Sequence, residues 1–81
     1  MDILNEIETT IKHSLPDAEV YVRDPQQDGQ HFEALVVSPQ FEGMPLIKQH
    51  KMVMNALKEQ LKETVHALAL KTMTPKQWET N

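Results

Sequence analysis

The chain has 81 residues, which fits one small domain, and we expect residues 1–81 to fold as a single unit. Its 8 basic and 12 acidic residues give a formal net charge of −4, which disfavours nucleic-acid binding unless the basic residues cluster. There is no cysteine to supply a disulfide or a thiolate ligand. The acidic start lacks a secretory signal and no apolar run approaches the roughly 18 residues of a membrane span, so we expect a cytoplasmic protein.

Residues 2–14 are predicted to form an amphipathic helix. Asp2 can cap its first turn, and Pro16 ends it. The apolar side chains recur at helical spacing and gather on one face: Ile3, Leu4, Ile7, Ile11 and Leu15.

Residues 18–38 are predicted to form an antiparallel hairpin. Apolar and polar side chains alternate over 18–23, which is typical of a half-buried strand. Residues 24–30 have the composition of a turn, with Pro25 and Asp28-Gly29. Residues 31–38 are apolar on both faces in their second half, as a central strand would be. Phe41 then anchors a connector that bends at Gly43.

A second helix is predicted from Pro45 to about residue 62, followed by a strand at 64–72 and a short final helix. Thr74, Pro75 and Gln77 form the capping pattern of that last helix, and Trp78 is expected to fold back on the body. The apolar stripe of the second helix covers an arc of about 120° and comprises Leu46, Ile47, His50, Val53, Met54, Leu57 and Leu61.

The element order is therefore α-β-β-α-β-α, an α+β fold. A right-handed crossover through the second helix makes the third strand parallel to the second. We expect a mixed three-stranded sheet with its helices packed on one face.

Four histidines are the candidates for chemistry, and no pair shows the i,i+4 spacing of a helical zinc site. His13 and His66 are interpreted as structural. His31 lies where the turn meets the second strand, a favourable place for a ligand, although a half-exposed strand histidine is the simpler explanation. His50 interrupts an apolar stripe, so it is either a core residue or an imidazole offered at the rim of the sheet.

Four lysines project from the far side of the second helix: Lys48, Lys51, Lys58 and Lys62. They form either a solvated helix face or a docking stripe for an acidic or phosphate-bearing partner. Catalysis has little support, because no nucleophile has an evident base and no glycine-rich phosphate loop is present.

Two segments together resemble the BolA family: "HFEALVVSPQFEGMPLIKQHKMVMNALKEQL" and "VHALALKTMTPKQWE". The resemblance extends from about Tyr21 to Glu79. It implies a KH-like fold of the second type, with the same α-β-β-α-β-α order, and an adaptor rather than an enzyme.

The resemblance also implies a monothiol glutaredoxin as partner, in a heterodimer that shares a [2Fe-2S] cluster with bound glutathione. His50 matches the family's main histidine ligand, and His31 matches a second ligand in a loop that is short here. Histidine can replace cysteine on one iron of such a cluster, and a chain without cysteine needs a partner to hold one.

Two functions remain open. The first is the glutaredoxin-linked adaptor in iron–sulfur cluster trafficking and iron homeostasis. The second is a nucleic-acid-binding regulator of transcription or stress response that uses the KH-like fold, with DNA as its possible partner. The isolated chain is expected to be a monomer or a weak homodimer. For the adaptor, the expected partner contacts are Lys48, Lys51, Thr74, Pro75, Lys76 and Trp78.

Overall fold

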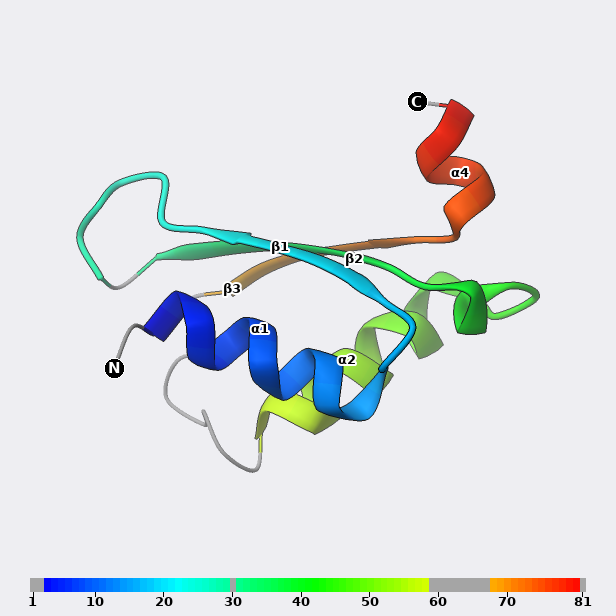
Figure 1. The fold of residues 1–81 in the computed structure, drawn as a ribbon, viewed down its shortest axis with the longest axis horizontal. Coiled ribbons are helices and arrows are strands. Elements are labelled where there is room, and N and C mark those ends of the chain that lie inside the picture. Colours follow the sequence, from blue (N-terminus) through cyan, green and yellow to red (C-terminus); the bar gives the residue numbers. More distant parts are fainter. Residues whose placement is uncertain (1–2, 30, 59–67, 81) are drawn as a thin grey trace.

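The structure is a computed structural model that describes residues 3–29, 31–58 and 68–80 (Figure 1). The predicted order of helices and strands is confirmed within these ranges. The elements are α1 (Ile3–Ser14), β1 (Glu19–Arg23), β2 (Phe32–Val37), a 3-10 turn (Pro39–Phe41), α2 (Leu46–Lys58), β3 (Leu68–Met73) and α4 (Pro75–Thr80). The predicted extensions of the second helix over 59–62 and of the third strand over 64–67 lie outside the described residues.

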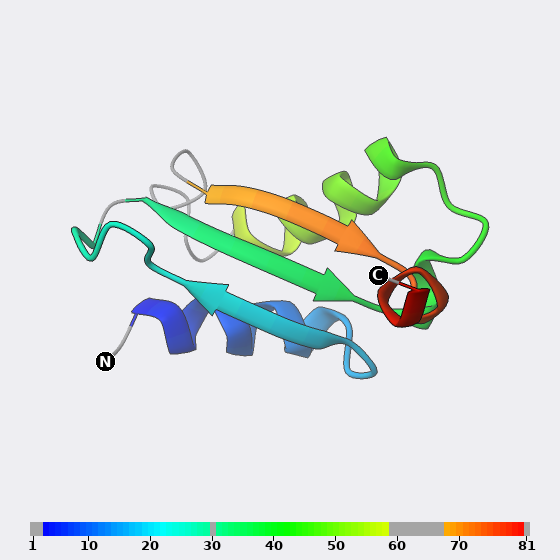
Figure 2. The ribbon, with the colours of Figure 1, turned by 90° about the horizontal axis from the view of Figure 1, so that it is seen from above.

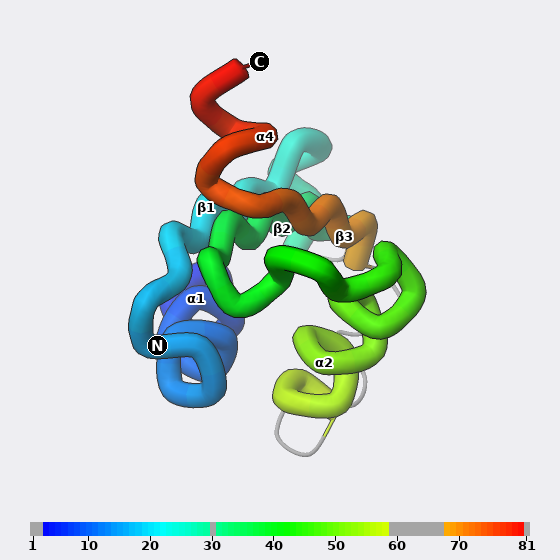
Figure 3. Tube along the Cα trace, turned by 90° about the vertical axis from the view of Figure 1, so that its right-hand side faces the viewer, coloured from blue at the N-terminus to red at the C-terminus, as the bar shows by residue number. Residues whose placement is uncertain are grey.

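The three strands form one sheet in the order β1-β2-β3 (Figure 2). β1 runs antiparallel to β2, and β3 runs parallel to β2, so the predicted mixed sheet and central strand are confirmed. α1 and α2 lie side by side against one face, whereas α4 lies beyond the opposite face at the end of β3 (Figures 1 and 3). The expectation of helices on one face therefore holds for the two long helices, and α4 is the exception.

The core lies between the sheet and the two long helices. The predicted face of α1 is correct at its centre, where Ile7 and Ile11 are fully buried. Side chains from α1, β1, β2, α2 and the connecting segments form one cluster, which comprises Ile7, Ile11, Leu15, Ala18, Val20, Phe32, Val36, Phe41, Val53 and Leu57.

The connector after β2 is anchored as predicted. The buried Ser38 side chain accepts a hydrogen bond from the Gln40 N–H at 3.1 Å and caps the short 3-10 turn. Phe41 is fully buried. Gly43 has a φ of +74°, a left-handed conformation that side-chain-bearing residues rarely adopt, and this bend directs the chain into α2.

The buried side of α2 differs from the predicted stripe. Leu46 and Ile47 are 59% and 67% exposed, whereas Gln49 is only 6% exposed. Gln49 is buried because both ends of its amide are paired: Nε2 donates to the Met44 carbonyl and Oε1 accepts from Thr72 Oγ1, each at 2.8 Å. The helix therefore turns Gln49, Val53 and Leu57 toward the core, and its first apolar pair faces outward. Leu61, the last predicted member of the stripe, lies outside the described residues.

The capping pattern of α4 is formed as predicted. Gln77 N–H donates to Thr74 Oγ1 at 3.2 Å, and Thr74 N–H donates to Gln77 Oε1 at 2.9 Å. This reciprocal pair fixes the direction in which α4 leaves the sheet. The helices that the structure describes are all too short or too polar to cross a lipid bilayer.

Candidate functional site

His50 lies in the second turn of α2 and is partly exposed. The exposed Leu46 and Ile47 precede it by four and three residues, so the three side chains share one side of the helix. Within the described ranges, no hydrogen-bond or ion-pair partner holds the His50 imidazole. His50 is therefore neither a buried core histidine nor a ring oriented by a described neighbour.

His31 has a different environment at the end of the β1–β2 loop. Its N–H donates to Asp28 Oδ1 at 3.0 Å, and its ring Nδ1 lies 2.8 Å from Asp28 Oδ2. An ionised carboxylate can only accept, so this contact makes Nδ1 the donor and leaves the lone pair of a neutral ring on Nε2. The His31 side chain is 57% exposed. A carboxylate that orients an imidazole in this way is a common support for a metal-binding histidine.

The structure does not bring His31 and His50 together. Gln49, the neighbour of His50, bonds to Thr72, which pairs with Val36 near one end of β2. His31 precedes Phe32, which begins the other end of the same strand.

These two ends are four register positions apart, about 13 Å along the strand. Two ligands of one metal ion lie on the order of 4 Å apart, because each metal–nitrogen bond is about 2 Å long. His31 and His50 therefore do not fit as two ligands of one iron in this structure, and each stays a candidate ligand of the cluster by itself.

The expected partner contacts gather at the end of the molecule where His50 lies. The first turns of α2 and the start of α4 both adjoin the carboxyl ends of β2 and β3 (Figures 2 and 3). Lys48 and Lys51 are exposed on α2. On α4, Lys76 and Trp78 are exposed. His31 lies at the opposite end of the sheet, with the β1–β2 loop (Figure 2).

The lysine face of α2 is confirmed for its described members. Lys48, Lys51 and Lys58 are exposed, and none forms an ion pair with another described residue. Lys62 lies outside the described residues, as does His66. His13 is exposed in the last turn of α1.

The tertiary structure also reveals features that the sequence pattern missed. The outward-facing Leu46 and Ile47 depend on the burial of Gln49, whose partner Thr72 is 23 residues away and leaves no periodic signal. In the part of the chain that the structure describes, no three histidines or carboxylates are close enough to hold a metal ion.

Residues 2–77 match the family model described as BolA-like protein. The chain belongs to the BolA-like family. The solved structure of a BolA homologue from Coxiella burnetii is 38% identical to this chain and superimposes with a TM-score of 0.80. The match covers 98% of this chain and 99% of the homologue. The family assignment and the fold from the structure thus agree.

Two BolA-like relatives differ in how much of their length is matched. The uncharacterised protein RP812 of Rickettsia prowazekii is 36% identical over 69 residues, which are 85% of this chain and 90% of the relative. The Escherichia coli protein named DNA-binding transcriptional regulator BolA is 47% identical over 49 residues, which are 60% of this chain and 47% of the relative. The matched region thus spans about half the length of the E. coli protein.

Proposed function

We propose that this BolA-like protein is a non-enzymatic adaptor that pairs with a monothiol glutaredoxin and supplies an imidazole to a shared [2Fe-2S] cluster. Its role would be in iron–sulfur cluster trafficking and iron homeostasis. The observation that carries this proposal is the exposed apolar pair Leu46 and Ile47 beside the partly exposed His50. This combination suits a protein-binding surface with a metal-ligating side chain inside it.

The apolar pair supports docking because its exposure follows from the packing of α2. Because Gln49 is buried against Thr72, Leu46 and Ile47 face outward. In the isolated chain their apolar side chains are exposed to water, which is unfavourable. A partner that covers both side chains would recover that free energy. Lys48 and Lys51 beside the pair would add contacts to acidic groups at the rim of such an interface.

The chemistry of the cluster explains why a partner is required. A [2Fe-2S] cluster needs four ligands, and when bound it supplies one-electron redox and iron-transfer chemistry. This chain has no cysteine, so in the proposed complex glutaredoxin and glutathione provide the thiolates. The chain's own contribution is a neutral imidazole, and protonation of that imidazole would release the iron.

The identity of the imidazole is the next question, because His31 and His50 lie too far apart to share one iron. His50 has the apolar docking pair beside it, whereas His31 has a ring oriented by Asp28. In addition, His31 adjoins Phe32, which pairs with Leu68 at the start of β3.

In the sequence, His66 precedes Leu68 by two residues. If His31 is a ligand, His66 is therefore the residue to test as its companion. If His50 is the ligand, His31 does not join it on the same iron.

Anaerobic reconstitution with a monothiol glutaredoxin and glutathione tests the proposal and separates these alternatives. Visible circular dichroism would be recorded for the wild-type complex and for His50→Ala, His31→Ala and His66→Ala. His13→Ala is the matched control, because His13 is exposed in the last turn of α1 and belongs to neither candidate site.

A spectrum that changes on addition of the wild-type chain and reverts with His50→Ala supports the site on α2. Reversion with His31→Ala, but not with His50→Ala, places the ligand at the other end of the sheet, and reversion with His66→Ala identifies His66 as a ligand. The proposal is contradicted if the wild-type chain leaves the glutaredoxin spectrum unchanged and no species of the size of a heterodimer forms.

DNA binding is the second candidate, favoured by one observation. The described lysines of α2 form an unpaired basic face on a chain of net charge −4. Two results together would support DNA binding by this chain. Its affinity for a DNA duplex would fall steeply as the salt concentration rises, and the triple variant Lys48→Gln, Lys51→Gln, Lys58→Gln would no longer bind the duplex. No retention at low salt would exclude it.

A further inference from the structure

The open face of the sheet, opposite α1 and α2, contains a groove of about 450 Å³. This volume lies within the range of about 300–1,000 Å³ that is typical of small-molecule sites. The groove runs across all three strands, and its outward-facing lining comprises Tyr21, Arg23, Glu33, Leu35, Ala69 and Lys71. None of these residues belongs to the surface around His50.

The hollow results from the strand register. Ala69 of β3 pairs with Glu33 of β2, and the next outward-facing pair is Leu35 with Lys71. The methyl group of Ala69 is short, whereas the side chains around it are long, so the surface sinks at this position. Leu35 and Ala69 give the groove an apolar floor.

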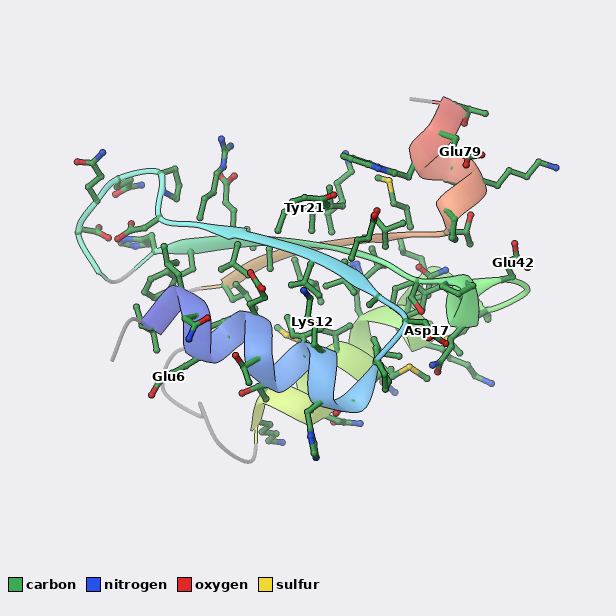
Figure 4. The ribbon with its side chains drawn as sticks, viewed as in Figure 1. Glu6, Lys12, Asp17, Tyr21, Glu42 and Glu79 are labelled. Atoms are coloured by element: carbon green, nitrogen blue, oxygen red, sulfur yellow. The ribbon has the colours of Figure 1, made fainter. Side chains whose placement is uncertain are left out.

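One side of the groove is aromatic. Tyr21 of β1 is 50% exposed and projects from the open face on the side of α4 (Figure 4). Its ring stacks on Trp78, with centroids 5.7 Å apart and an interplanar angle of 28°. The capping pair of α4 and this stacking hold the Tyr21 ring in place, so a planar ligand would meet a preformed aromatic surface.

The charges that line the groove do not cancel. Arg23 Nε and Nη2 contact Glu33 Oε1 at 2.7 and 2.6 Å, which makes this pair neutral. Lys71 is exposed and has no ion-pair partner among the residues that the structure describes. One uncompensated positive charge therefore lies in an apolar groove of an acidic protein.

We propose that this groove binds a small planar aromatic anion. Its ring lies over Leu35 and Ala69 against Tyr21, and its single anionic group contacts the Lys71 ammonium. A cation is disfavoured by Lys71. A long polyanion is disfavoured because Glu33 is close by and the groove offers one free positive charge. Mononucleotides and aromatic carboxylates share the required chemistry.

Chemical-shift titration of the full ¹⁵N-labelled chain tests this site. Two anionic probes, AMP and indole-3-carboxylate, are compared with their uncharged counterparts, adenosine and indole. We expect either anion to shift the amides of residues 21–23, 33–35 and 69–71, with a Kd on the order of 1 mM for a ligand of this size. A response to AMP alone identifies a mononucleotide site, and a response to the carboxylate alone identifies an aromatic-acid site.

Matched variants test the assigned contacts. Lys71→Gln is expected to weaken binding of the anion about tenfold, whereas Lys58→Gln, which removes an exposed lysine from α2, leaves the Kd unchanged. Ala69→Leu fills the hollow and is expected to abolish binding. The proposal is overturned if neither anion shifts these amides at 10-fold the expected Kd of about 1 mM, if the uncharged probes bind equally well, or if Lys58→Gln weakens binding as much as Lys71→Gln.

Discussion

The hydrogen bond between Thr72 and Gln49 connects β3 to the start of α2 and sets which side of that helix faces outward. Thr72→Val keeps the shape of the side chain but removes the hydroxyl that donates to Gln49 Oε1 at 2.8 Å. Thr72 and Gln49 are each 6% exposed, so water cannot easily replace the lost donor.

The expected cost combines two contributions. The lost hydrogen bond is worth about 1 kcal/mol net, and leaving a buried amide oxygen without its donor adds up to about 1 kcal/mol more. We therefore expect the free energy of unfolding to fall by about 1–2 kcal/mol. For a domain of this size, that lowers Tm by about 4–16 °C.

Urea and thermal unfolding followed by far-ultraviolet circular dichroism measure this loss. Thr80→Val is the matched control: the Thr80 hydroxyl also donates hydrogen bonds, to the carbonyls of Lys76 and Gln77, but Thr80 is exposed at the end of α4. We expect the control to cost less than about 0.5 kcal/mol. If both variants lose the same small amount of stability, Gln49 is not held by Thr72 and the explanation for the outward-facing Leu46 and Ile47 is wrong.

Three further predictions concern the backbone, the C-terminal helix and the docking surface. Gly43→Ala places a side chain at a φ of +74°, so it should lower the free energy of unfolding, measured by chemical denaturation, by about 1 kcal/mol. Gly43→Asn should lower it less, because asparagine tolerates this conformation better. Equal losses in the two variants would contradict this explanation. Gln77→Ala removes the acceptor of the Thr74 N–H and should weaken the near-ultraviolet circular dichroism of the stacked Trp78, while the far-ultraviolet signal of the rest of the fold persists. Replacing Leu46 and Ile47 by serine should weaken the affinity for glutaredoxin at least about tenfold in calorimetric titration, with stability changed by less than about 0.5 kcal/mol, because both side chains are exposed in the free chain. Unchanged affinity would remove this surface from the proposed interface.

Local signals were sufficient to predict most of the fold. The helical spacing of Ile7 and Ile11 correctly gave the buried face of α1, and the alternation over 18–23 correctly gave the outward direction of Tyr21. The capping pattern predicted around Thr74 is also present in the structure. These features depend on neighbours within one turn or one strand, so periodicity and short motifs are enough to find them.

Long-range packing accounts for what the sequence did not predict. A polar residue such as Gln49 is assigned to the surface unless its partner is known, and that partner, Thr72, comes from a different element. As a result, the predicted apolar stripe of α2 was wrong at Leu46 and Ile47. Likewise, the sequence places His31 and His50 at the ends of elements, but only the strand register shows that these are opposite ends of the sheet.

The most direct test of the proposed function is the visible circular dichroism of a [2Fe-2S] cluster reconstituted on a monothiol glutaredoxin with glutathione, before and after this chain is added. We predict a changed spectrum with the wild-type chain and with His13→Ala, and loss of that change when the ligating histidine is replaced. A spectrum that stays the same with the wild-type chain, or one that survives each of the variants His50→Ala, His31→Ala and His66→Ala, would contradict histidine ligation by this protein.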